Sequence, residues 1–253
     1  MMVNQNGGKE IYYLGFYEVG TLHVIDNCLR PDDNFIDVGA SIGLMSIFAA
    51  KKINDGIVLS FEPQKERYEI LKRNMAINGR TNIQAFNNGL GEVNQQLKLY
   101  TDVFSPSIID IETTKGQFEM IDILILDEIL ESKKIDVVKF IKIDVEGFEI
   151  SVLRGAKVLL SGKHAPIICV EYVKRLQNLN NTDVTIFNFI TSINNYRIFQ
   201  LEKSSNTISK LKEVHHEKDL RDFDNMYCFT ENNLINLNSD KLFKKSSAER
   251  GKS

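Results

Sequence analysis

The chain has 253 residues, of which 43% are hydrophobic and 26% are charged, a composition typical of a soluble globular protein with one large α/β domain. Its net charge of −3 gives no overall basic field, so we expect no nucleic-acid partner. The three cysteines lie far apart and indicate neither a disulfide framework nor a zinc site.

The first part of the chain alternates between short apolar runs and helical patterns. Residues 34–39, 56–63 and 82–91 read as buried parallel strands that end at glycine or proline. Residues 43–53 and 64–78 carry apolar side chains at helical spacing. This β-α-β-α-β order with short connections predicts a parallel sheet covered on both faces by helices.

The rest of the chain adds further strands and helices. Strands are predicted over residues 95–100, 118–126, 137–147, 165–172, 196–202 and 225–231, and helices over residues 126–135, 148–162 and 183–194. The first two of these strands read as a β-ribbon, and the last two as an antiparallel pair. The polar loop 101–117 is either a substrate lid or a connector, and the charged stretch 203–221 is predicted to be a surface excursion.

An acid, Asp37, lies in the first apolar run, which otherwise reads as buried. Gly39, Ala40 and Gly43 follow it and remove side-chain bulk, so backbone N–H groups and a helix N-terminus can approach a ligand there. A tight turn without a ligand is the alternative. The spacing of the glycines is not G-x-G-x-x-G, which disfavours an NAD-dependent oxidoreductase.

Further acids end other strands, where ligands bind in open α/β sheets. Glu62 follows the second strand, and a carboxylate there can accept two hydrogen bonds from a ribose diol. A solvated loop residue is the other interpretation of Glu62. Glu171 ends a later strand in the same manner.

Lys142, Asp144 and Glu146 alternate along one predicted strand and would share a face if the strand continued. Asp144 could then take the proton of an incoming hydroxyl nucleophile. Alternatively, Asp144 with Glu146 or Glu171 could hold a divalent cation, magnesium or calcium. A third interpretation is an internal ion pair between Lys142 and Glu146 that supports the fold.

The chain resembles the FkbM-type S-adenosylmethionine-dependent methyltransferases in three stretches: FIDVGASIGLMSIFAAKK, VLSFEPQKERYEILKRNMAINGRTNIQAFNNGLGE and VVKFIKIDVEGFEISVLRGAKVLL. The resemblance runs from about Tyr17 to Tyr172, in the order and spacing of the family. F-E-P together with K-I-D-V-E-G-x-E is its most specific part. It implies a Rossmann-like class I methyltransferase fold, α/β, with a mostly parallel seven-stranded sheet and helices on both faces.

The resemblance also implies roles for individual residues. The predicted cofactor-binding set is Tyr17, Glu18, Asp37, Gly39, Ala40, Ser41, Gly43, Glu62, Pro63, Asn88, Gly89 and Asp144. The predicted catalytic set, which comes from the alternating strand residues rather than from the resemblance, is Asp144, Lys142 and Glu146. Asp37 would hold the ammonium end of S-adenosylmethionine, and Glu62 its ribose. The implied reaction is O-methylation of a sugar, a glycan or another polyhydroxylated small molecule.

The expected organisation is an N-terminal helical or lid segment (1–33), a methyltransferase domain (34–235) and a disordered tail (236–253). No apolar run reaches the length of about 18 residues that a membrane span needs, and the first residues lack a signal-peptide pattern, so we expect a cytoplasmic protein. A non-catalytic cofactor-binding protein stays an alternative. The presence of Asp37, Glu62 and Asp144 together disfavours it.

Overall fold

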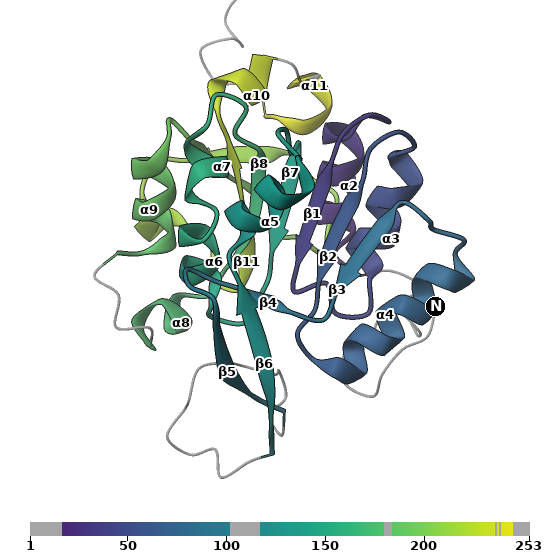
Figure 1. Cartoon of the computed structure of the whole chain (residues 1–253). Coiled ribbons are helices and arrows are strands. Elements are labelled where there is room, and N and C mark those ends of the chain that lie inside the picture. The colour runs from purple at the N-terminus through teal and green to yellow at the C-terminus, as the bar shows by residue number, and fades with distance from the viewer. Residues whose placement is uncertain (1–16, 102–116, 180–183, 236, 238, 245–253) are drawn as a thin grey trace, which may run out of the picture.

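The computed structural model describes residues 17–101, 117–179, 184–235, 237 and 239–244 (Figure 1). The strands of its main sheet are β1 (Phe35–Val38), β2 (Val58–Phe61), β3 (Ile83–Phe86), β7 (Phe140–Ile143), β8 (Ile167–Tyr172), β9 (Arg197–Leu201), β10 (Leu211–Val214) and β11 (Asp224–Phe229). Their order across the sheet is β10-β9-β11-β8-β7-β1-β2-β3. The neighbours from β3 to β8 are parallel, and β11 pairs antiparallel with both β8 and β9. The predicted α/β architecture, a mostly parallel sheet with helices on both faces, is confirmed.

The main sheet has eight strands, one more than the seven predicted. The additional strand, β10, lies in the stretch that was expected to be a surface excursion, and it pairs antiparallel with β9. Of its four residues only Leu211 is fully buried, at 1% exposure. A strand at the edge of a sheet needs little apolar sequence, and its polar pattern therefore resembled a loop.

A second, three-stranded sheet has the order β4-β6-β5, with β4 (Gly89–Leu90), β5 (Gln95–Tyr100) and β6 (Phe118–Leu124). The predicted strand over residues 82–91 is therefore divided between the two sheets. β5 and β6 form the predicted antiparallel ribbon, which projects from the body of the molecule in Figure 1. Residues 102–116, on which the lid-or-connector interpretation falls, lie outside the described residues.

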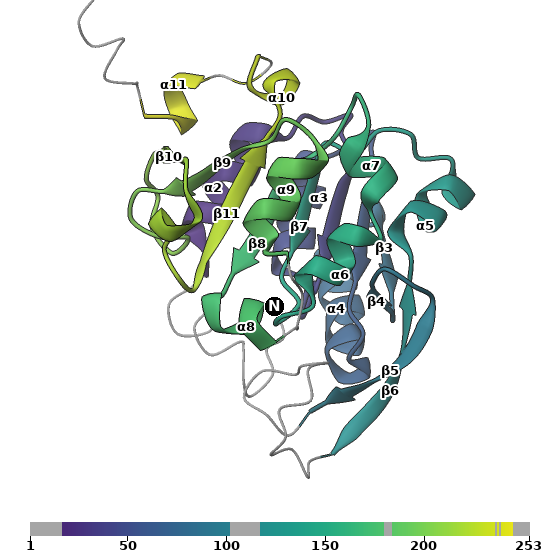
Figure 2. The same cartoon turned by 90° about the vertical axis from the view of Figure 1, so that its left-hand side faces the viewer.

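The helices are α2 (Val19–Cys28), α3 (Leu44–Lys52), α4 (Lys65–Ile77), α5 (Leu126–Lys133), α6 (Glu149–Arg154), α7 (Lys157–Ser161), α8 (Lys174–Leu179), α9 (Ile186–Ile193), α10 (Glu231–Ile235) and α11 (Ser239–Leu242), with a 3-10 turn at Glu217–Asp219. Successive strand residues point to opposite faces. Phe35 and Phe140, whose rings stack at 5.6 Å, therefore pack with α2 and α3, whereas Ile36 and Ile141 pack with α5, α6, α7 and α9 (Figure 2). None of the helices in the described ranges combines the length and apolar character needed to cross a bilayer.

Both ends of the described chain pack against this body. α2 buries Val24 and Ile25 completely. Part of the tail that was predicted to be disordered is helical, since α11 lies within it. The side chain of Leu242, in this helix, is 1% exposed. The ring of Phe243 lies 5.1 Å from that of Phe199, so apolar contact orders this segment. Residues 245–253 of the predicted tail are outside the described part of the chain.

Candidate active site

The turn after β1 is packed so closely that it requires glycine. Gly39 has φ +80°, and a Cβ atom there would lie 1.8 Å from the carbonyl oxygen of Asp144. The backbone N–H groups of Gly39 and Ala40 both donate to the carbonyl of Phe61, at 3.0 and 2.9 Å. The backbones that leave β1, β2 and β7 therefore meet at this point without an intervening side chain.

The same turn is supported by α4. Gly43 has φ +90°, and a Cβ atom there would lie 2.4 Å from Cδ1 of Leu71. Nδ2 of the buried Asn74 donates to the carbonyl of Ile42 at 2.8 Å. Ser41 adopts a positive φ of 49°, which leaves its N–H group directed at the end of β2. Asn74 was missed in the sequence because nothing marks an asparagine in a helix as the support of a distant turn.

Glu62, at the end of β2, joins this turn to the start of α4. Its Oε2 accepts a hydrogen bond from the N–H of Ser41 at 2.7 Å, and its Oε1 accepts one from the N–H of Gln64 at 2.9 Å. Burial raises the pKa of Glu62 to about 7, against the opposing effects of Arg67 and of the two N–H groups. Each carboxylate oxygen can accept a further hydrogen bond, so the side chain keeps capacity for a ligand.

Asp37 is 1% exposed and is only partly satisfied. Its Oδ2 accepts a hydrogen bond from the hydroxyl of Ser46 at 2.5 Å, and Ser60 in turn donates to Ser46 at 2.7 Å. Its Oδ1 is buried and has no hydrogen-bond partner within the described residues. Burial raises the pKa of Asp37, while Lys142 and the bond from Ser46 oppose the rise. An unmet buried carboxylate oxygen is costly unless a cation or a donor reaches it.

Lys142 is a buried cation among carboxylates. It lies opposite Asp37 in the β1–β7 register, and its Nζ is 2.7 Å from Oδ2 of Asp144. Burial alone would lower the pKa of Lys142, but Asp144, Glu18 and Asp37 together raise it well above its usual value. The ion pair seen here is therefore Lys142–Asp144, whereas the sequence had left a Lys142–Glu146 pair open.

The turn after β7 differs from the predicted strand. β7 ends at Ile143, and Glu146 and Gly147 have positive φ values of 53° and 102°, so the alternation from Lys142 to Glu146 does not continue. Glu149 supports the turn, because its Oε1 accepts hydrogen bonds from the N–H groups of Val145 (3.2 Å) and Gly147 (3.0 Å). Burial raises the pKa of Glu149 to about 7. Its signal in the sequence was the last glutamate of K-I-D-V-E-G-x-E.

Two further acids border the same region. Glu18 precedes α2 with φ +48°, and its Oε1 accepts a hydrogen bond from Nδ2 of Asn225 at 3.3 Å. Burial raises the pKa of Glu18 to about 7, and Lys142 opposes the rise. Glu171, near the end of β8, has a pKa raised to about 9, first by burial and then by neighbouring carboxylates. An oxygen of each side chain, Oε2, is buried without a hydrogen-bond partner among the residues described.

The model of the family described as "Methyltransferase FkbM domain" matches residues 37–198, which is more than half of the chain. The chain belongs to the FkbM methyltransferase domain family. "Methyltransferase 1" of Beauveria bassiana (strain ARSEF 2860) is 29% identical over 169 residues, 58% of this chain and 65% of that protein. "Methyltransferase sdnD" of Sordaria araneosa is 39% identical over 64 residues, 25% of each chain. The chain thus spans just under two thirds and one quarter of these relatives.

A solved structure of precorrin-6y C5,15-methyltransferase from Geobacter metallireducens GS-15 overlaps the FkbM chain at 11% sequence identity. The overlap covers 83% of this chain and 85% of that one, with a TM-score of 0.45. At 11% sequence identity, this similarity says nothing about which molecule the chain acts on.

The remaining predicted cofactor residues lie at the β3–β4 junction and before α2. A Cβ atom on Gly89 would lie 3.8 Å from Cβ of Pro63, so these two residues are neighbours. Asn88, next to Gly89, is half-buried, but it is Asn87 that donates to the carbonyls of Glu62 (3.0 Å) and Pro63 (2.8 Å). These bonds tie the ends of β2 and β3 together.

Tyr17, the first residue that the structure describes, is 40% exposed. Burial of the hydroxyl group, followed by the charges of Glu18 and Asp144, raises the pKa of Tyr17. The predicted Tyr17–Glu18 pair is therefore near Asp144.

Asp144, Glu146 and Glu171 were the residues considered for a divalent cation. Across the described ranges, no three His, Cys, Asp or Glu side chains are grouped in the way that a metal ion requires. The described residues therefore give no support for the cation.

The raised pKa values predict that the FkbM domain loses stability as pH rises. Glu18, Glu62 and Glu149 have a pKa of about 7 and Glu171 has a pKa of about 9, whereas the ordinary pKa of a glutamate is 4.5. The folded state therefore binds more protons than the unfolded state between these limits, and the free energy of unfolding decreases as pH rises through them. Thermal unfolding without ligand should show Tm decreasing over this window, with a shallower decrease in Glu171→Gln. A rising Tm would contradict the prediction.

Proposed function

We propose that the chain transfers the methyl group of S-adenosylmethionine to a hydroxyl of a sugar or another polyhydroxylated acceptor. The observation that carries this proposal is the 2.7 Å bond from Ser41 N–H to Glu62, inside a domain of the FkbM family. This bond joins a glycine turn and a carboxylate at adjacent strand ends, the arrangement that nucleoside-binding α/β folds use. The acceptor class rests on the family resemblance.

The residues fit S-adenosylmethionine. The unmet Oδ1 of Asp37 suits an ammonium group, which would relieve the cost of its burial. Glu62 keeps lone pairs for two ribose hydroxyls, and the neighbouring Pro63 and Gly89 offer a small apolar surface for a flat base. We assign Tyr17 and Glu18, the two described residues that precede α2, to covering the cofactor.

Bound S-adenosylmethionine supplies an electrophilic methyl group. The chain itself contributes alignment: Gly39 lets the backbone approach the ligand, and Lys142 fixes the carboxylate of Asp144 beside it. An acceptor hydroxyl must also lose its proton to become an effective nucleophile, and the carboxylates at the ends of β7 and β8, Asp144 and Glu171, are the groups proposed to receive it.

The cofactor assignment is tested by ligand binding to wild type and Glu62→Gln. S-adenosylmethionine at about 100 times its dissociation constant should add about 2.7 kcal/mol to wild-type stability, and NAD should add nothing. Glu62→Gln should weaken binding by roughly 10- to 100-fold, because a hydrogen bond to a charged group contributes about 1.5–3 kcal/mol. Calorimetric titration measures both affinities.

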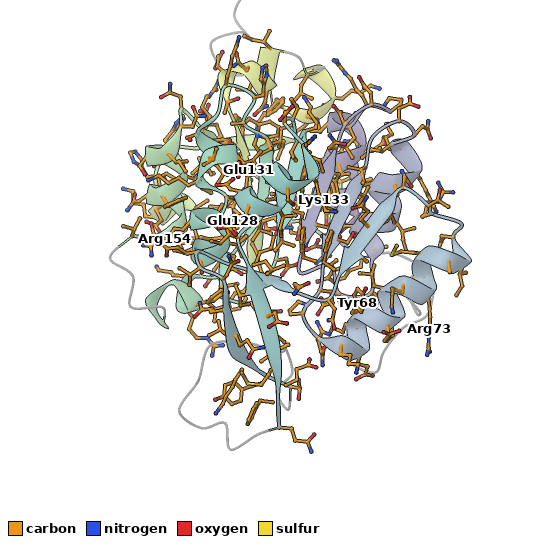
Figure 3. All side chains as sticks on the ribbon, viewed as in Figure 1. Tyr68, Arg73, Glu128, Glu131, Lys133 and Arg154 are labelled. Atoms are coloured by element: carbon orange, nitrogen blue, oxygen red, sulfur yellow. The ribbon has the colours of Figure 1, made fainter. Side chains whose placement is uncertain are left out.

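Glu131→Gln is the matched control, since Glu131 is exposed on α5 (Figure 3), and this variant should bind like wild type. Stabilisation by NAD alone would favour the oxidoreductase alternative. If S-adenosylmethionine binds but no labelled methyl group is transferred to any of a panel of sugars and polyols, the acceptor class is wrong and the cofactor assignment stands.

A further inference from the structure

Glu171 is a carboxylate at the edge of the site with one side-chain oxygen that has no hydrogen-bond partner among the described residues. The β7–β8 register pairs Ile143 with Val170, so Asp144 and Glu171 are the next residues on two adjacent parallel strands. Asp144 in turn lies against the turn at Gly39, where the cofactor is proposed to bind. Glu171 is therefore one strand further from the glycine turn than Asp144, on the side away from β2.

The two acids differ in their partners. Oδ2 of Asp144 is held by the Nζ of Lys142 at 2.7 Å, and proton transfer to this oxygen would have to compete with a buried ammonium group. Oε2 of Glu171 has no hydrogen-bond partner in the described part of the chain, and the residue is only half-buried. On the neighbouring strand β11, the residue paired with Glu171 is Asn225, whose amide side chain carries no charge that could neutralise a carboxylate.

The charged and titratable groups that face Glu171 come from several elements. They are Asp144 and Lys142 from β7 and its end, Glu146 from the following turn, Glu149 from α6 and Tyr17 from the segment before α2. Among the described residues named here, three are carboxylates and one is an ammonium group. Burial and these carboxylates raise the pKa of Glu171 to about 9, so the group holds a proton until a positive charge arrives.

We propose that Glu171, rather than Asp144, is the catalytic residue that accepts the proton of the acceptor hydroxyl, and that the positive sulfonium of the cofactor ionises it beforehand. The inference rests on the proposed function. In the transfer, the acceptor oxygen forms a bond to the methyl carbon as the carbon–sulfur bond breaks. The electron pair of that bond stays on sulfur, and the hydroxyl proton moves to Glu171. The proton that Glu171 held earlier is released to solvent when the cofactor binds.

The test compares S-adenosylmethionine with S-adenosylhomocysteine, which lacks the methyl group and the positive charge on sulfur. Calorimetric titrations at about pH 8, in buffers of different ionisation enthalpy, count the protons released on binding. Wild type should release up to about one proton more with S-adenosylmethionine than Glu171→Gln does. Ionisation of the ligands themselves cancels in this comparison. With S-adenosylhomocysteine the two proteins should behave alike, and Glu131→Gln should match wild type throughout.

The outcomes separate this inference from the proposed function. If wild type binds neither ligand, the cofactor assignment itself fails. If both ligands bind but the proton release is unchanged in Glu171→Gln, or is lost only in Glu18→Gln or Asp144→Asn, Glu171 is not the group and the inference is overturned. If Glu171→Gln does not fold, infrared difference spectroscopy of wild type decides. A protonated-carboxyl band that S-adenosylmethionine removes and S-adenosylhomocysteine leaves supports the inference, and a band unaffected by either ligand overturns it.

Discussion

Replacing Gly39 by alanine is expected to destabilise the fold by roughly 4 kcal/mol or more. The new Cβ atom would lie 1.8 Å from the carbonyl oxygen of Asp144, which belongs to the backbone and cannot rotate away. The φ of +80° adds a conformational cost of about 1–2 kcal/mol for any residue with a side chain. The ends of β1 and β7 would have to separate, and both hydrogen bonds to Phe61 would be strained. Chemical denaturation measures the loss.

Gly79→Ala is the matched control for this substitution. Gly79 also has a positive φ, +60°, but a Cβ atom there would have nothing within 4 Å. Its expected cost is therefore the conformational one alone, about 1–2 kcal/mol. Equal losses in the two variants would show that the close approach of β1 and β7 does not exist.

Lys142→Met is expected to destabilise the protein by about 3–5 kcal/mol, because it removes the cation from a buried ion pair and leaves the carboxylate behind. Asp144, Asp37 and Glu18 all contribute to holding the ammonium, so more than one acid is left uncompensated. Burial raises the pKa of Glu18 and Asp37, so these two acids can take up protons when the cation is gone. The loss should therefore be smaller at about pH 5 than at about pH 8, as measured by denaturation at both values.

Two further variants sharpen this result. Lys52→Met removes an exposed lysine that pairs with Asp26 at 2.8 Å, and its cost should stay within about 1 kcal/mol. Adding Asp144→Asn to Lys142→Met should recover part of the stability, since it removes one unpaired charge. A double variant less stable than Lys142→Met would mean that Asp144 is not the main partner of the lysine.

The central fold could be predicted from the sequence because each parallel strand is a short, uninterrupted apolar run between turn signals. β1, β2 and β7 are buried at every position, so their sequences carry the signal on both faces. β10 is different, because the sheet needs only one face of an edge strand to be apolar. α11 was also missed, because a helix that buries one apolar side chain, Leu242, leaves little hydrophobic pattern in the sequence.

Residues of the candidate site could be predicted where they lie at the carboxyl end of a strand: Asp37 is the last but one residue of β1, and Glu62 and Asp144 directly follow β2 and β7. The parallel alignment of strand ends brings such positions together without knowledge of side-chain packing. The contacts of Glu149 and Lys142 could not be read in this way. Glu149 accepts hydrogen bonds from backbone N–H groups that only the left-handed turn leaves free. Lys142 pairs with Asp144 because β7 ends at Ile143 and the chain turns there.

The position of α2 has a consequence for the order in which the chain folds. The side chain of Glu18 is hydrogen-bonded to that of Asn225, which is 207 residues away in the sequence. The side chain of Thr21 is hydrogen-bonded to that of Tyr227, which is 206 residues away. During synthesis the strands from β1 to β8 leave the ribosome before β11 exists. α2 must therefore wait for the strand that completes its contacts, and such long-range closure is slow. In a nascent chain, the acidic edge of the site would be the last part to acquire its final structure.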